Sequence, residues 1–254
     1  MNEGSLYVHS TGGVGIVEFS HPQGNSLPGA LLDRMARAFG EMNDDPSVKV
    51  VILRSEGGRA FCAGASLSEL LSIETRGEAD AFFRGFGSVI ESMINCRKPV
   101  IGRIQGKAVG GAVGLIAACD YVMATRQAAA RLSEWSIGIG PFVIEPVISY
   151  KAGVAATMQM SMSPTRWFDA YWMKDRGLYA RVFDTIDELD HEVDHLAAAW
   201  THYSEEAASR IKRMNWEGLK DYGKLMRERA AISGELVLTP GAKSALSKFK
   251  KRRS

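Results

Sequence analysis

The sequence lacks the features that mark several large classes of protein. No stretch of its 254 residues approaches the roughly 18 consecutive apolar residues that a membrane-spanning helix needs. The first ten residues, MNEGSLYVHS, contain no apolar segment of the kind found in secretory signal peptides. The formal net charge is only +2, so charge provides no general case for nucleic acid or an anionic membrane as a partner. We therefore expect a soluble, cytoplasmic protein with neither kind of partner.

Cysteine and metal-ligand motifs are equally sparse. The three cysteines, Cys62, Cys96 and Cys119, have no CxxC spacing and lie in apolar segments, as is typical of buried, reduced thiols in a cytosolic protein. The histidines form no HExxH pattern. His191 and His195 are four residues apart, but we expect ordinary surface side chains there. The sequence predicts no metal ion and no other cofactor.

What is present is the composition of a globular protein with a sizeable core. Hydrophobic residues make up 46% of the chain and charged residues 24%, which are ordinary values for a soluble domain. Short β-type segments at 6–10 and 14–20 flank Thr11-Gly12-Gly13, which is a hairpin signal. Further along, predicted strands alternate with predicted helices, the pattern of an α/β fold with parallel strands. The strands are predicted at 48–53, 99–104 and 121–125, and the helices begin near Pro28, at Ser66 and near residue 78.

After about residue 155 the predicted strands largely stop, and apolar residues between 189 and 200 recur with the period of a helix. We therefore divide the chain into an α/β domain over 1–195 and a helical region over 196–254. The chain closes on KFKKRRS, residues 248–254. This basic end is expected to be a solvated tail, the alternative being contact with an anionic group such as a phosphate.

Two glycine-bearing loops each follow a predicted strand and open a predicted helix. They read FCAGASLSEL (61–70) and GKAVGGAVGL (106–115). The first backbone N–H groups of a helix have no partner within the helix, and small residues let a ligand approach them closely. Two such N–H groups directed at one oxygen atom form an oxyanion hole.

Two common glycine motifs of nucleotide-binding proteins do not match these loops. A Walker A loop requires GxxxxGK[ST], but here Gly106-Lys107 is followed by Ala108. A dinucleotide-binding fingerprint requires GxGxxG with an acidic residue about 20 positions further on, and Asp120 comes too soon. Tight helix packing also favours glycine and alanine, so the spacing alone does not decide between packing and ligand binding.

Four segments together resemble the crotonase superfamily, the enoyl-CoA hydratases and isomerases. FCAGASL is similar to the family loop F-x-A-G-A-D-L, and KPVIGRIQGKAVGGAVGLIAACDYVMAT to its K-P-x-I-A-x-[IV]-x-G-x-A-x-G-G-G-x-E-L-x-x-x-C-D segment. GIVEFSHPQGNSL resembles the start of the family's substrate loop, and SPTRWFDAYWMKDRGLYARVF resembles the stretch that leads into G-L-V-x-x-V. The similarity runs from about residue 7 to residue 215.

The resemblance implies an α/β fold built as a spiral of ββα turns, followed by C-terminal helices that form trimers, sometimes paired into hexamers. It also implies coenzyme A thioester substrates, whose carbonyl oxygen would accept hydrogen bonds from the N–H groups of Ala65 and Gly111. Neighbouring positions of the same motifs imply substrate contacts at Ala63, Ser66, Leu67 and Gly110. Two departures are mild: Ser66 replaces the family aspartate, and Ala112 replaces the third glycine of the triplet.

A third departure concerns the catalytic acids. The family's hydratases use two glutamates, and here the first of those positions is Gly114. The second aligns with Glu134, so the resemblance leaves one acid–base group. A single carboxylate suffices to take a proton from one carbon and return it two carbons along, which is isomerase chemistry. Trp135 adjoins Glu134 and is expected to contact the substrate, where an apolar wall would raise the carboxylate's pKa.

Several alternatives remain open from the sequence. Hydration is possible, because some family members that hydrate aryl-conjugated substrates use one glutamate. A catalytically weak acyl-CoA-binding protein is a second alternative. RNA binding has only the basic end in its favour. Nucleophilic dehalogenation is disfavoured because the required aspartate falls at Phe142. Glu145 would be a second acid only if its loop turned back, and Glu69 is expected to act as a capping residue at Ser66.

Overall fold

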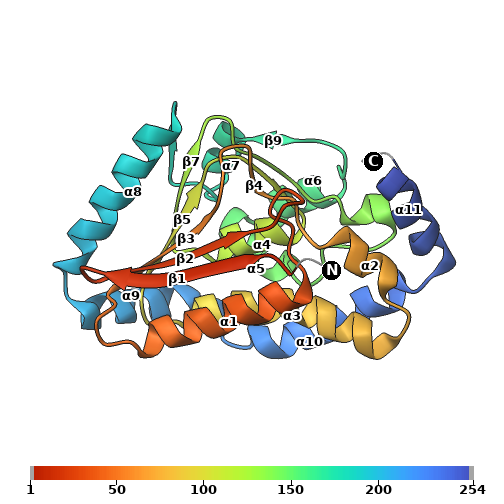
Figure 1. Ribbon diagram of the computed structural model, residues 1–254, viewed down its shortest axis with the longest axis horizontal. Coiled ribbons are helices and arrows are strands. Elements are labelled where there is room, and N and C mark those ends of the chain that lie inside the picture. The colour runs from red at the N-terminus through yellow and green to blue at the C-terminus, as the bar shows by residue number, and fades with distance from the viewer. Residues whose placement is uncertain (1–2, 252–254) are drawn as a thin grey trace.

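In the computed structural model, which describes residues 3–251, two β-sheets form the centre of the molecule (Figure 1). The larger sheet has the strand order β1-β2-β3-β5-β7-β10, and the smaller sheet has the order β4-β6-β8-β9. The strands are β1 Ser5–Thr11, β2 Val14–Ser20, β3 Val50–Ser55, β4 Ala60–Cys62, β5 Val100–Ile104, β6 Lys107–Val109, β7 Tyr121–Thr125, β8 Ala129–Arg131, β9 Phe168–Asp169 and β10 Arg181–Phe183.

The strand directions confirm the predicted fold class. β1 and β2 form the expected antiparallel hairpin, and every other pair of neighbours in the larger sheet is parallel. In the smaller sheet β4 pairs with β6 and β6 with β8 in parallel, and only β8–β9 is antiparallel. The polypeptide therefore alternates between a strand of the large sheet, a strand of the small sheet and a helix, which is a spiral arrangement.

Helices cover the sheets on both sides. In Figure 1 the helices α1, α3 and α10 run side by side below the strands, whereas α8 stands at the opposite face of the large sheet. The helices are α1 Gly29–Asp44, α2 Leu67–Ser72, α3 Arg76–Asn95, α4 Gly111–Ala118, α5 Glu145–Ala152, α6 Val154–Ser161, α7 Ala170–Asp175, α8 Ile186–Thr201, α9 Glu205–Trp216, α10 Tyr222–Val237 and α11 Pro240–Lys251, with the 3-10 turns η1 Glu134–Ile137 and η2 Glu217–Leu219.

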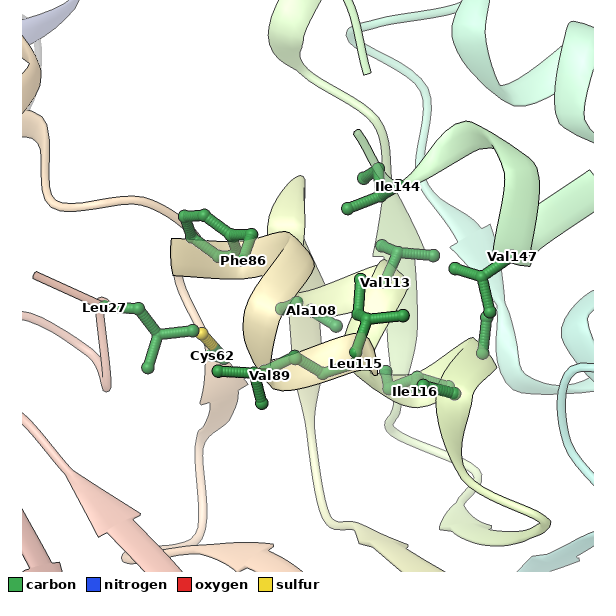
Figure 2. Packing of buried hydrophobic residues seen from close by; sticks show 14 of the residues in the cluster. Leu27, Cys62, Phe86, Val89, Ala108, Val113, Leu115, Ile116, Ile144 and Val147 are labelled. Carbon is green, nitrogen blue, oxygen red and sulfur yellow. The ribbon is translucent and has the colours of Figure 1, made fainter. Parts of the chain in front are cut away.

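The large sheet separates two apolar clusters. The smaller cluster lies between the sheet and α8, where Val50, Ile52, Ile101 and Met123 contact one face of that helix. The larger cluster fills the space among α1, α3, α4, α5 and the two sheets. Figure 2 shows part of it, with Phe86 and Val89 of α3 near Leu27 and Cys62. The α4 helix is buried along its length, so its apolar sequence reflects a position inside the molecule.

The second half of the chain differs from the expectation in detail. Two short strands, β9 and β10, follow residue 155 and complete the edges of both sheets. The predicted boundary at 195 falls inside α8, which is continuous from Ile186 to Thr201. Of the basic end, residues 252–254 lie outside the described part of the chain. Within residues 3–251, no helix combines the length and the apolar character needed to cross a lipid bilayer.

Candidate active site

The two glycine-bearing loops meet at a single cavity of about 90 Å³. The parallel pairing of β4 with β6 places the loops side by side, since each loop follows the carboxyl end of one of these strands. Ala63, Gly64 and Ala65 line the cavity from the first loop, and Val109, Gly110 and Gly111 from the second. The apolar part of the wall includes Leu67, Leu70, Phe83, Phe86, Ile139 and Ile144.

The first loop is fixed by the chain that precedes α1. The amide of Leu27 donates to the carbonyl of Gly64 at 2.8 Å, and the amide of Ser66 donates to the carbonyl of Leu27 at 3.0 Å. Because N–H directions alternate along extended chain, the N–H of Ala65 points away from Leu27. Gly64 has φ +87°, and a Cβ there would lie 2.6 Å from the carbonyl oxygen of Val109. Only glycine therefore allows the two loops to lie this close.

The second loop leads into α4 through two glycines, and at each of these positions a Cβ atom would clash with a neighbouring side chain. Gly110 has φ +58°, and a Cβ on it would lie 2.9 Å from Oε1 of Glu134. A Cβ on Gly111 would lie 2.2 Å from the ring of Phe86. Gly111 is the first residue of α4, where a backbone N–H has no partner within the helix. Among the residues that the structure describes, neither Ala65 nor Gly111 donates its N–H to another protein group.

Glu134 opens the 3-10 turn η1 and lies at the same cavity. Its Oε2 atom is buried and has no hydrogen-bond partner in the described part of the chain. Burial raises the pKa of the Glu134 carboxyl to about 7, because an ionised carboxylate loses its hydration there, although a hydrogen bond from its own backbone partly opposes the effect. Both protonation states are therefore populated near neutral pH.

The space where a side chain at position 114 would lie is filled by the protein itself. A Cβ on Gly114 would be 2.4 Å from Cγ2 of Ile144 and 3.1 Å from Cδ1 of Ile90. Figure 2 shows Ile144 beside Val113 of α4, directed toward that helix. A longer side chain at position 114 does not fit while Ile144 is present, so an apolar group takes the place of a second acid.

Of the other residues predicted for the site, Ala63, Leu67 and Gly110 line the cavity, whereas Ser66 and Trp135 do not. Ser66 is buried and caps α2, its hydroxyl accepting from the amide of Glu69 at 3.4 Å. The Trp135 side chain is 55% exposed, so it is not part of the cavity wall that surrounds the carboxyl group.

Two further acidic residues have partners elsewhere. The carboxylate of Glu69 accepts a hydrogen bond at 2.9 Å from the amide of Gly29, so it caps the start of α1 rather than completing a capping box with Ser66. Glu145 accepts from the hydroxyl of Ser149 at 2.6 Å and lies 3.7 Å from Arg229. Neither acid lines the cavity, and Glu134 is the acidic residue that does.

Sequence reasoning did not identify several residues of the wall. Phe86 of α3, Ile144 before α5 and Ser233 of α10 all line the cavity, and so do Arg131 and Ser133, which precede Glu134 in the sequence. Most of these residues are distant in sequence from the loops that they face, so no local motif marks them. In the described part of the chain, no group of three or more His, Cys, Asp or Glu side chains is placed to hold a metal ion.

Comparisons with known proteins agree with this architecture. The family model for enoyl-CoA hydratase/isomerase matches residues 9–236. A peroxisomal Δ(3,5)-Δ(2,4)-dienoyl-CoA isomerase of Arabidopsis thaliana is 33% identical over 188 residues, 68% of this chain and 66% of its own. A carnitinyl-CoA dehydratase of Proteus mirabilis is 33% identical over 137 residues, 54% of this chain and 52% of its own. The chain thus spans just under two thirds of the first relative and about half of the second.

Among solved structures, an enoyl-CoA hydratase from Bacillus halodurans superposes with a TM-score of 0.88 at 18% identity, covering 96% of this chain and 99% of that one. At this identity the likeness concerns the fold alone. The family model, in contrast, covers most of the sequence, including both loops and Glu134. The chain belongs to the enoyl-CoA hydratase/isomerase family of the crotonase superfamily.

Proposed function

We propose that this protein shifts the double bond of an enoyl-CoA thioester by proton transfer through one carboxylate. The observation that carries the proposal is the pairing of Gly114 with Ile144. The position of a second acid holds no side chain, and its space is filled by an apolar one. Glu134 is then the acid–base group of the cavity, with a carboxyl whose pKa burial raises to about 7.

In the proposed reaction, the thioester carbonyl oxygen of a 3-enoyl-CoA accepts hydrogen bonds from the N–H groups of Ala65 and Gly111. Ionised Glu134 removes a proton from C2, and the electron pair of that C–H bond delocalises onto the carbonyl oxygen and C4 as a dienolate. The two N–H groups stabilise the charge on oxygen. Protonated Glu134 then delivers the same proton to C4, which gives the 2-enoyl-CoA and restores the carboxylate.

The apolar wall supports a reaction in which water takes no part. Phe86 lies against Gly111, and Ile144 lies against Gly114, so the reacting carbons would be flanked by hydrocarbon. In the two-glutamate hydratases that the sequence resembles, a second acid helps to hold and orient the water molecule beside the β-carbon. No acidic side chain of the described residues other than Glu134 lines the cavity to do so.

To test the proposal, the protein is incubated with a 3-enoyl-CoA and, separately, with a 2-enoyl-CoA, and the products are identified by chromatography. We expect the two enoyl-CoA isomers to interconvert without a 3-hydroxyacyl-CoA. Formation of the hydroxy product would identify a hydratase instead. Tight acyl-CoA binding without turnover, unaffected by Glu134→Gln, would identify a binding protein.

We also propose that copies of the chain assemble into a trimer or hexamer. The support is a row of exposed apolar side chains along α6. Val154 and Met158 lie on the helix and Met162 caps its end; they are spaced four residues apart, and each is more than 60% exposed. Such a row on a soluble protein is typical of a surface that is covered in an assembly.

A further inference from the structure

The last helix, α11, lies outside the cavity but contacts both of its sides. It packs against α2 and against η1, and Figure 1 shows α11 beside α2 at the end of the molecule opposite α8. Helix α2 carries Leu67 and Leu70 of the cavity wall, and η1 begins with Glu134. One helix therefore connects the apolar wall to the element that holds the carboxylate.

The contact with η1 is a close approach of the Gly138 backbone to Ala242 of α11. Gly138 ends η1 with φ +80°, and a Cβ on it would lie 2.8 Å from the Cα atom of Ala242. Ala242 is itself buried. Because the Gly138 backbone packs directly against the backbone and the Cβ atom of Ala242, a shift of α11 would move the turn that ends η1.

The contact with α2 is made by the next residue, Lys243. Its ammonium group donates a hydrogen bond to the carbonyl oxygen of Ile73 and lies 3.5 Å from the carbonyl oxygens of both Leu70 and Leu71. The last carbonyl groups of a helix have no partner within the helix, and a cation there also interacts favourably with the helix dipole. Lys243 thus caps a helix that is far away in the sequence.

Helix α2 has only six residues, Leu67–Ser72, so contacts from outside determine where it lies. At its other side, Glu69 is anchored to the amide of Gly29 in α1. The end near Ile73 is held through Lys243. Helix α2 directly follows Ala65 and Ser66, and thus the same anchors also fix the direction of the chain that carries the Ala65 N–H.

We propose that Lys243 is a positioning residue of the active site. By holding the carboxyl-terminal end of α2 against α11 while Ala242 contacts Gly138, it fixes Leu67, Leu70 and the Ala65 loop relative to Glu134. The catalytic part of this inference rests on the proposed function, whereas the structural part does not.

The experiment uses three variants of the full chain. Lys243→Met keeps the unbranched side chain and removes its N–H donors, and Lys243→Arg keeps a charged donor. Lys248→Met is the matched control, since Lys248 is an exposed lysine of the same helix. For each variant, amide hydrogen exchange over residues 67–73, thermal unfolding, and kcat and KM for enoyl-CoA isomerisation are measured.

In Lys243→Met we expect exchange over residues 67–73 to be about tenfold faster, the effect of losing one hydrogen bond to a charged group. We expect KM to rise several-fold with a smaller change in kcat, because the wall that binds the acyl group is loosened and Glu134 is retained. Lys243→Arg should restore both values, and Lys248→Met should leave them unchanged.

Unchanged exchange over residues 67–73 in Lys243→Met, or the same increase in Lys248→Met, would overturn the inference. Failure of arginine to restore the exchange rate would also overturn it. Absence of isomerisation by the unmodified protein would instead contradict the proposed function, and the exchange comparison would still decide whether Lys243 holds α2.

Discussion

Glu134 combines two properties that a single acid–base group needs. Its Oε2 atom is removed from water, which favours the protonated carboxylic acid, while its Oε1 atom lies next to the Gly110 backbone at the cavity. A group that first accepts and then returns a proton works best when neither state is strongly favoured, and a pKa of about 7 satisfies that condition.

The pH dependence of the reaction follows from this group. The free enzyme must present the ionised carboxylate to the substrate, so kcat/KM for a 3-enoyl-CoA should rise with pH and level off above about pH 7. Glu134→Gln should lower kcat by about 10² to 10⁴-fold. Initial rates between pH 5 and pH 9 check both expectations. A flat profile over this range would show that Glu134 is not the base.

The same burial predicts that Glu134 weakens the fold at alkaline pH. Its pKa is about 7 in the folded protein against 4.5 for an unperturbed glutamate, so the folded state binds the proton more tightly. Between these two values the contribution of Glu134 to folding stability falls as the pH rises. Above pH 7, Glu134→Gln should therefore raise the free energy of unfolding by up to about 3 kcal/mol.

Urea unfolding of Glu134→Gln and the unmodified protein at pH 5 and pH 8 measures this effect. The difference in the free energy of unfolding should be clearly larger at pH 8 than at pH 5. An equal difference at both pH values would mean that the carboxyl group is not buried as described.

A second prediction at the scale of single residues concerns the stability effect of replacing Gly111. Its Cβ would overlap the ring of Phe86, so Gly111→Ala should cost about 1 to 3 kcal/mol of stability and move the Gly111 N–H. Gly40 is the control, because it is exposed in α1 and a Cβ there meets nothing within 4 Å. Gly40→Ala should instead stabilise the protein by up to about 1 kcal/mol. Thermal unfolding distinguishes the two; similar effects would contradict the packing described.

The secondary structure shows what sequence patterns predict well. The hairpin of β1 and β2, the strand β7 and the amphipathic helices α1, α3 and α8 appear where periodicity and turn residues place them, within a few residues. Strong local signals determine these elements: Thr11-Gly12-Gly13 for the hairpin, and apolar residues every three or four positions for the helices.

Elements that depend on distant partners were not predictable in the same way. β9 and β10 have two and three residues, and they are strands only because β8 and β7 offer free edges. Glu69 has capping-box spacing to Ser66, yet its carboxylate accepts a hydrogen bond from the amide of Gly29 in another helix. The loops and Glu134 were visible in the sequence, but Ile144 was not, because only the fold brings it to Gly114.

Packing between α4 and the start of α5 is testable by a double-mutant cycle. Gly114→Ala should cost about 1 to 3 kcal/mol, since its Cβ would overlap Ile144. In a protein that already carries Ile144→Ala, the same change should cost much less, because the side chain it would meet has been shortened. Urea unfolding of the four proteins measures the coupling energy, and additive effects would show that the two positions do not compete for one space.

The surface of the whole molecule carries a prediction about assembly. If the exposed row on α6 is covered by another copy, Met158→Glu combined with Met162→Glu should reduce the molar mass in solution to that of one chain. Tyr7→Glu is the control, since Tyr7 is comparably exposed, at 58%, but lies on β1. Light scattering after size-exclusion chromatography gives the masses. A single-chain mass for the unmodified protein, or no effect of the α6 changes, would contradict the proposed assembly.

The pairing of β4 with β6 has a consequence for how proteins of this shape diversify. Ala60 pairs with Lys107 and Cys62 with Ala108, so the two loops start from neighbouring rungs of one ladder. Inserting or deleting a residue between either strand and its loop would separate the amides of Ala65 and Gly111. Changes in acyl preference are therefore expected at wall residues outside the ladder, such as Leu67, Phe86 and Ile144, where one side chain can replace another without altering the length of either loop.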